Sequence, residues 1–142
     1  KGVDEDKEAF EQVSKAYSMA KQTDSEKAAR REAIAIASVG AADAPLKLMR
    51  AGVCALRLAA DMIGKSNANL VSDLYVAALN LNAGVVQTVS SSLPPRKAAS
   101  YNVAANIPYI ADRELAASWG AEAGELAGAA AELAGQILDA GN

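Results

Sequence analysis

Apolar side chains recur along the chain with the period of α-helices. Between positions 4 and 20 they stand at Phe10, Val13, Ala16 and Tyr17, and this spacing of three and four residues is that of an amphipathic helix. The first segment is therefore expected to be a helix that packs one face against another part of the protein.

A second helix is expected to begin at Thr23. Thr23 and Glu26 have the spacing of a capping box, in which a hydroxyl and a carboxylate satisfy each other's free backbone amides. The helical pattern weakens at Gly40, and Pro45 has no backbone N–H to donate. We therefore expect a kink or an interruption before Leu46.

The middle of the chain predicts two helix ends and one loop. Gly64 is expected to end the helix that spans 46–63, because glycine readily takes the left-handed conformation found there. Asn69 is expected to cap a third helix over 70–89. The segment 90–99 holds three serines and two consecutive prolines, which predict a loop or a sharp break.

The last part of the chain predicts a short helix over 102–107 and a long one over 112–138. Small residues recur in the long helix at Gly120, Gly124 and Gly128. In an isolated helix each glycine costs about 1 kcal/mol relative to alanine, so we expect close packing against another helix to offset that loss.

Composition supports one helical domain. The chain has 142 residues, of which 51% are hydrophobic, enough for one core but not for two. Aromatic residues make up only 4%, so the core must be built from small side chains that let helices approach closely. The prediction is an all-α fold, a bundle of long, partly kinked antiparallel helices formed by residues 1–142.

The charge distribution argues against nucleic acid as a partner, and the cysteine content bears on the cellular compartment. The net charge is −3, with both signs interspersed, so no basic block is available to follow a nucleic-acid backbone. Cys54 is the only cysteine, which excludes an intrachain disulfide; we expect a buried, inert thiol and a cytoplasmic protein. No signal-like or membrane-spanning segment is apparent, and we expect no membrane association.

The absence of histidine excludes several kinds of active site. Without it the chain cannot assemble a Ser-His-Asp triad, a Cys-His pair or a histidine-based zinc site. The C-terminal glycines lie in a helical pattern, where a dinucleotide-binding fingerprint has no meaning. Nicotinamide and ATP chemistry are therefore disfavoured.

A few polar residues stand out in this apolar background. Asp73, Asn80 and Gln87 recur every seven residues and share one helix face, which either carries chemistry or is simply the solvated side. Lys21 precedes a capped helix start, where free amides and a cation could bind a carboxylate or a phosphate, although a lysine in such a loop is usually just solvated. Asn102 and Asn106 are four residues apart, so a helix would bring both amides together, although capping or exposure is the alternative.

Several short motifs, taken in order, resemble the formimidoyltetrahydrofolate cyclodeaminase and methenyltetrahydrofolate cyclohydrolase family. Residues 6–10, DKEAF, resemble its D-x-x-A-F helix, and 21–30 its P-K-N-T-x-E-E-K-A-A-R turn. Residues 44–46, APL, are similar to its V-P-L kink. The segment 67–78 resembles G-N-x-x-x-x-S-D-x-x-V-A-A, and 102–107 resembles N-V-x-x-N-L.

The resemblance extends from about residue 4 to residue 115, with departures. The family's glycine-rich N-terminal motif and first long helices have no counterpart here, which suggests a truncated N-terminus. Ala20, Ser66 and Tyr75 replace the family's usual proline, glycine and smaller or polar residue. The interval before Asn102 is also longer than the family's, with the extra length centred on 90–97.

The resemblance implies an enzyme of folate one-carbon metabolism that forms a homodimer. It would convert 5-formimidoyltetrahydrofolate to 5,10-methenyltetrahydrofolate with release of ammonia, or hydrolyse the methenyl compound. Neither reaction requires a metal or a redox cofactor, so the resemblance implies none. A noncatalytic helical association domain is the alternative. Since a buried carboxylate is the most available proton-transfer group in a histidine-free site, Asp73 is the expected catalytic residue. The expected substrate-binding residues are Lys21, for the glutamate carboxylates, and Asn67, Ser72, Asn102 and Asn106.

Overall fold

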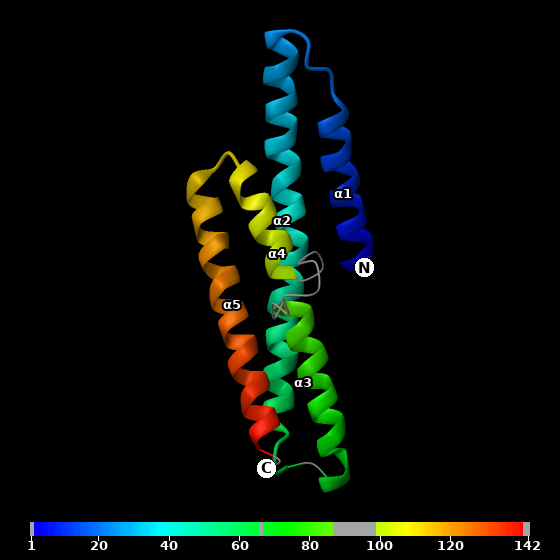
Figure 1. Cartoon of the computed structure of the whole chain (residues 1–142), viewed down its shortest axis with the longest axis vertical. Coiled ribbons are helices and arrows are strands. Elements are labelled where there is room, and N and C mark those ends of the chain that lie inside the picture. Colours follow the sequence, from blue (N-terminus) through cyan, green and yellow to red (C-terminus); the bar gives the residue numbers. More distant parts are fainter. Residues whose placement is uncertain (1, 66, 87–98, 141–142) are drawn as a thin grey trace, which may run out of the picture.

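One long helix, α2, is the axis on which the rest of the described structure is arranged. The computed structural model describes residues 2–65, 67–86 and 99–140. In chain order its elements are α1 (Gly2–Ser18), α2 (Asp24–Asp61), the 3₁₀ turn η1 (Ala68–Leu70), α3 (Val71–Val85), α4 (Ala99–Asn106), the 3₁₀ turn η2 (Ile107–Tyr109) and α5 (Arg113–Asp139). With 38 residues, α2 is about 57 Å long at 1.5 Å per residue. Figure 1 shows α1 along its upper part and α3 along its lower part, with α4 and α5 on the other side.

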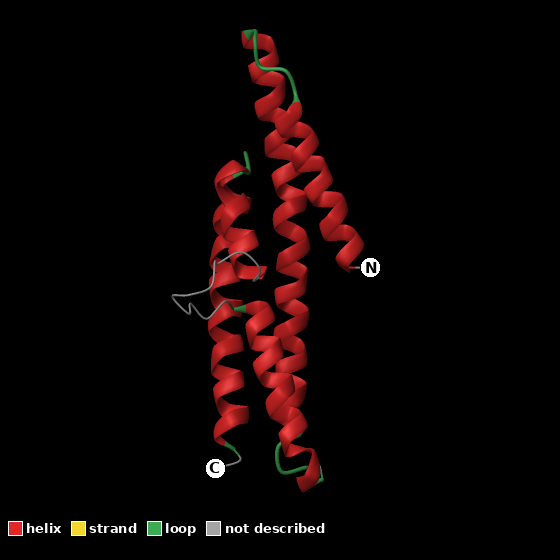
Figure 2. Ribbon diagram, turned by 45° about the vertical axis from the view of Figure 1, so that its right-hand side comes forward, coloured by secondary structure: helices red, strands yellow, loops and turns green. Residues whose placement is uncertain are grey.

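The all-α prediction is confirmed. The part of the chain that the structure describes contains helices and their connections but no strand, as Figure 2 shows. None of the helices in these ranges is long and apolar enough to cross a membrane. The predicted loop over 90–99 and the end of the third helix beyond Val86, including Gln87, lie outside the described residues.

The start of α2 follows from its first residues. The Thr23 hydroxyl oxygen accepts a hydrogen bond from the Glu26 amide at 3.2 Å, and a Glu26 carboxylate oxygen accepts one from the Thr23 amide at 2.8 Å. The predicted capping box is confirmed. Because the Glu26 carboxylate also accepts a hydrogen bond from the Gln22 amide, these bonds hold the pKa of Glu26 below its usual value.

The expected interruption at Pro45 was wrong. Helix α2 runs without a break from Asp24 to Asp61 and carries Pro45 in its interior. Proline removes one backbone hydrogen bond there. Pro45 is nevertheless buried, and the neighbouring Leu46 and Met49 are fully buried in the bundle, so packing holds the helix together where local propensity would break it.

Between α2 and α3, the predicted helix end at Gly64 is confirmed, whereas the predicted helix cap at Asn69 is wrong. Gly64 has a φ of +70°, which confirms the left-handed helix end. Asn69 is not the cap of the third helix, because α3 begins after Leu70 with no side-chain cap. Instead, the Asn67 side-chain oxygen accepts the Asn69 amide at 3.0 Å and shapes the η1 turn that precedes α3.

Small residues allow α2 and α3 to approach closely at Gly52. The core between α2, α3, α4 and α5 is made mostly of alanine and aliphatic side chains, with Leu56, Val103 and Ile137 fully buried. At Gly52, a Cβ atom would collide with the Val85 side chain. This glycine, which sequence reasoning did not single out, marks a close helix contact.

The expected close packing at Gly120, Gly124 and Gly128 was wrong for the single chain. All three are exposed, and a Cβ added at any of them would meet nothing within 4 Å. The packed face of α5 instead carries buried alanines, such as Ala123 and Ala130. Helical periodicity places one face inward, and the glycines lie on the other.

The orientation of α2 in the bundle determines the exposure of Cys54 and the ion pair of Arg50. Cys54 is exposed, not buried as expected, because it follows the buried Val53 by one residue and so points about 100° away from it. Arg50 points toward α5 and forms a bidentate ion pair with Glu122, with N–O distances of 2.6 and 2.8 Å. That hydrogen bonding lowers the pKa of the Glu122 carboxyl.

The two kinds of glycine predict opposite responses to alanine. Gly52→Ala should destabilise the protein by about 1–3 kcal/mol, because the new methyl group must displace Val85 or separate the helices. Gly120→Ala should be neutral or stabilising by up to about 1 kcal/mol. Urea unfolding of both variants measures the difference, and equal effects would contradict the assigned close contact.

Candidate functional site

The six predicted site residues occupy three separate regions of one chain. Lys21 lies in the connection between α1 and α2 at the top of Figure 1, and Asn67, Ser72 and Asp73 lie near the start of α3 at the bottom. These regions are separated by most of the length of α2. Asn102 and Asn106 lie between them, on α4. A single pocket formed by all six residues is therefore not present within one chain.

The helix start beside Lys21 is already satisfied internally. The amides of Gln22 and Thr23 donate to the Glu26 carboxylate, and the Glu26 amide donates to the Thr23 hydroxyl. The sequence had suggested that these amides could bind a substrate carboxylate. They are not free to do so, because Glu26 and Thr23 already accept their hydrogen bonds. Lys21 itself is exposed.

Asp73 is exposed in the first turn of α3, as is Ser72. A nearby pocket of about 350 Å³ is lined mainly by Ile63, Val71, Leu74 and Tyr75, without Asp73. The expectation of a buried acid in an enclosed site was therefore wrong for the single chain. Of the three polar residues that recur every seven positions, Asp73 and Asn80 lie in the described structure. Both are exposed, which fits the alternative that this helix face is simply the solvated side. The catalytic role of Asp73 stays a prediction.

Asn102 and Asn106, by contrast, meet in a pocket between α1, α2 and α4. It has a volume of about 180 Å³ and is called the polar pocket here; its lining residues are Asp6, Ala9, Phe10, Val13, Ala41, Asn102 and Asn106. The D-x-x-A-F motif contributes three of them, Asp6, Ala9 and Phe10. Two motifs almost a hundred residues apart in sequence therefore converge on one place.

Pro45 explains how Asn106 comes to be in this pocket. In a regular helix the Ala41 carbonyl would accept the amide of residue 45, but proline has none. The Asn106 side-chain amide donates to that carbonyl at 3.4 Å and to the Asn102 carbonyl at 2.8 Å. Asn106 thus fastens α4 to α2, and its two amide hydrogens are used for positioning and not for a ligand.

Three polar groups in the pocket remain available. Within the described residues, the Asp6 carboxylate, the Asn102 side-chain amide and the Asn106 side-chain oxygen make no hydrogen bond or ion pair. Phe10 borders the pocket and is 71% exposed as a residue, so its ring is accessible for stacking. A carboxylate for proton transfer, two amides for orientation and a ring are suited to a planar, nitrogen-rich ligand.

Asp6 was not among the residues selected from the sequence. Its only signal was its place as the first letter of the D-x-x-A-F motif, in a helix start rich in acidic residues. Acidic residues near a helix N-terminus are usually explained by the helix dipole. Only the approach of α4 distinguishes Asp6 from its neighbours.

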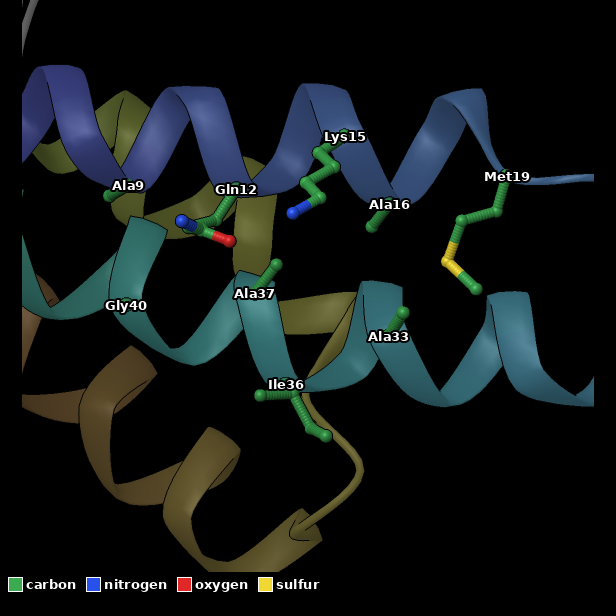
Figure 3. Close-up of a pocket in the computed structure, with 9 residues that line it drawn as sticks. All are labelled: Ala9, Gln12, Lys15, Ala16, Met19, Ala33, Ile36, Ala37 and Gly40. Atoms are coloured by element: carbon green, nitrogen blue, oxygen red, sulfur yellow. The ribbon is translucent and has the colours of Figure 1, made fainter.

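Another groove between α1 and α2 is less suited to catalysis. It has a volume of about 420 Å³, and Figure 3 shows Gln12 and Lys15 reaching into it above small residues such as Ala37. The other lining residues are Ala9, Ala16, Met19, Ala33, Ile36 and Gly40. It contains no carboxylate. In the part of the chain with described structure, no three His, Cys, Asp or Glu residues are grouped to hold a metal ion, and the expectation of metal-free chemistry stays a prediction.

Comparisons with known proteins point to one family. A family model described as formiminotransferase-cyclodeaminase matches residues 1–125. The chain is also 36% identical over 114 residues to a methenyltetrahydrofolate cyclohydrolase of Methylorubrum extorquens. That match covers 80% of this chain and 50% of the relative, so the chain spans about half the length of this curated relative.

The pairing of Pro45 with Asn106 can be tested by a double-mutant cycle. Asn106→Ala should cost about 1 kcal/mol more in the natural background than in a Pro45→Ala background, where the new amide satisfies the Ala41 carbonyl. The lost bond to the Asn102 carbonyl is common to both backgrounds and cancels. Urea unfolding of the four proteins gives the coupling energy, and a value near zero would show that Asn106 does not replace the missing donor.

Proposed function

The chain belongs to the formiminotransferase-cyclodeaminase family, and we propose that the protein acts on the one-carbon unit carried between N5 and N10 of tetrahydrofolate. The observation that carries the proposal is the convergence of residues 6–10 and 102–106 on the polar pocket. A carboxylate and two amides face that space together. A carboxylate can transfer a proton at a folate nitrogen or at an attacking water, and the amides can orient the substrate.

Two reactions fit this chemistry. In the first, N10 attacks the formimidoyl carbon on N5, ammonia leaves and 5,10-methenyltetrahydrofolate forms. In the second, water attacks the methenyl carbon and the ring opens. The relative named methenyltetrahydrofolate cyclohydrolase supports the second reaction, and the family supports both. Each needs a group that accepts and returns a proton, and neither oxidises or reduces the substrate.

We assign the proton-transfer role first to Asp6. Its carboxylate borders the pocket without a partner among the described residues, so it can accept a proton from water or from a nitrogen. Asn102 can orient the ligand with its free amide, and the Phe10 ring can stack on a planar pterin. Asn106 acts mainly by holding α4 in place.

Asp73 is the second candidate for proton transfer, and this role would require a second copy of the chain to cover its carboxylate. Its carboxylate is exposed near the lower end of α2 and α3. An exposed acid gains an enclosed environment only if another surface covers it. The homodimer that the family resemblance implies would supply such a surface.

We propose that this homodimer forms on the outward face of α2. Ala33, Ala37 and Gly40 on α2 line the groove beside α1. The same three-and-four spacing continues below α1 as an apolar stripe of Leu48, Ala51, Ala55, Leu58 and Met62. All but the half-buried Ala55 are exposed, Leu48 by 58% and Leu58 by 62%. Association of two stripes would remove these leucines from water.

Substitution in the stripe should change the oligomeric state and not the fold. Leu58→Glu should convert a dimer to a monomer, because two carboxylates would have to be buried across the symmetry axis. Light scattering measures the molar mass, and circular dichroism checks that the helices persist. An exposed leucine elsewhere, Leu79→Glu on α3, is the control. A natural protein that is already monomeric, or a dimer unaffected by Leu58→Glu, would contradict the assigned surface.

The two acids can be separated by activity. Asp6→Asn should lower kcat for methenyltetrahydrofolate hydrolysis, or for ammonia release from 5-formimidoyltetrahydrofolate, by about 100-fold or more, since it removes the proton acceptor. Asp73→Asn should have little effect if Asp6 carries the reaction, and Glu8→Gln, on the exposed face of α1, is the matched control.

Loss of activity in Asp73→Asn alone would move the proton-transfer role to the start of α3. Absence of turnover in the natural protein, together with no rise in melting temperature on adding 5-formyltetrahydrofolate, would instead favour the noncatalytic association domain.

A further inference from the structure

A larger pocket, called the arginine-lined pocket here, lies near the opposite end of α1 from Asp6. It has a volume of about 1000 Å³, at the upper limit of the roughly 300–1,000 Å³ usual for ligand sites. Its charged and polar lining comes from the end of α1, the start of α2, η2 and the start of α5: Tyr17, Arg30, Arg31, Glu32, Tyr109, Asp112 and Arg113. Its apolar walls include Ile34, Val39 and Pro108.

Three guanidinium groups border this pocket, and none has a carboxylate partner in the described part of the chain. Arg30 donates to the Tyr17 carbonyl at 3.2 and 3.3 Å and stands 5.2 Å from the centre of the Tyr17 ring. Arg113 donates to the Pro108 carbonyl at 3.3 Å. Among the described residues, neither these two nor Arg31 forms an ion pair. Each guanidinium has five N–H donors, so most of those donors remain unused.

The two carboxylates beside the pocket do not neutralise these arginines. An Asp112 oxygen accepts the Leu115 amide at 2.9 Å as the cap of α5. Glu32 borders the pocket without an ion pair to any described residue. The formal balance of three positive and two negative groups leaves the pocket net cationic.

Tyrosine hydroxyls add neutral donors to this surface. Burial and a hydrogen bond to Tyr109 raise the pKa of Tyr17, so its hydroxyl stays protonated under ordinary conditions. A protonated hydroxyl can donate to an anionic oxygen. Guanidinium forks and hydroxyls beside an apolar wall are the groups that recognise carboxylates on an aromatic or aliphatic body.

The two pockets follow one face of α1. Asp6, Phe10 and Val13 border the polar pocket and Tyr17 borders the arginine-lined one, and these positions repeat every three or four residues. From Asp6 to Tyr17 is eleven residues, or about 16 Å of helix at 1.5 Å per residue. A ligand that reaches both pockets must therefore be extended.

We propose that Arg31 and Arg113, with Arg30 bonded to the Tyr17 carbonyl beside them in the pocket lining, form a subsite for a ligand's two carboxylates, replacing the role expected of Lys21. For the identity of the ligand's body, this inference rests on the proposed function: the glutamate end of a tetrahydrofolate would lie at the arginines while its pterin lies at Asp6. The recognised chemistry is a dicarboxylate, which could also be free glutamate.

Binding of ligand fragments tests the subsite separately from catalysis. The natural protein is titrated with N-(4-aminobenzoyl)-L-glutamate and with L-glutamate, followed by calorimetry. Arg31→Gln and Arg113→Gln should each weaken binding of the aminobenzoyl compound about tenfold or more, because each removes a charge-assisted contact. Arg57→Gln, an exposed arginine on the lower part of α2, and Lys21→Gln should leave it unchanged.

The outcomes distinguish this inference from the proposed function. If L-glutamate alone binds with the same affinity and the same sensitivity to Arg31→Gln, the subsite stands and its ligand is the free amino acid. If turnover of folate is absent but fragment binding shows the expected losses, the subsite stands without the proposed reaction.

Three results overturn the subsite. The first is no saturable binding of either fragment, and the second is binding unaffected by both arginine substitutions. The third applies to an active enzyme, in which Arg31→Gln and Arg113→Gln should raise KM for the folate substrate with kcat preserved; unchanged KM would place the carboxylates elsewhere.

Discussion

A missing hydrogen-bond donor in the middle of α2 organises the centre of this protein. Pro45 leaves the Ala41 carbonyl without its helical partner, and the Asn106 side chain from α4 supplies one. A buried carbonyl without a donor is unfavourable, so the defect in one helix specifies where another must bind. The same contact brings Asn102 beside α1 and creates the polar pocket. Pro45, which was expected to interrupt the helix, therefore creates the site on α2 to which α4 binds.

The rest of the candidate site is arranged along α1, a helix held mainly by α2. The capping box at Thr23 fixes the turn between these helices, and Arg30 then reaches back to the Tyr17 carbonyl at the end of α1. The lengths of the two helices determine which side chains of α1 face α4 and η2. Asp6 and Phe10 come to one end of that face and Tyr17 to the other. A small change in the conformation of the turn would therefore shift the α1 side chains that line both pockets.

The proposed site differs from the one expected from the sequence because similar polar residues can face different neighbours. Asp73 stands in the first turn of α3 and Asp6 just after the first turn of α1, and both are exposed in the single chain. Only Asp6 borders a pocket with other polar groups. Lys21 stands beside amides that Glu26 already occupies, whereas the pocket-lining arginines of α2 and α5 have no carboxylate partner among the described residues. The occupied amides belong to the local capping box, whereas the pocket at Asp6 and the surroundings of the arginines depend on segments distant in the sequence, which sequence position alone could not reveal.

The sequence by itself determined the helical class, the capping box at Thr23, the turn at Gly64, the start of the last helix and the family, because these depend on local spacing or on motifs read in order. Only the tertiary structure decided that α2 continues through Pro45, that Gly52 and not Gly120 is a close contact, and that Cys54 points outward. The reason is physical: helical periodicity fixes which residues share a face. Which face is buried, and which backbone defect a distant side chain can repair, depends on how the helices pack.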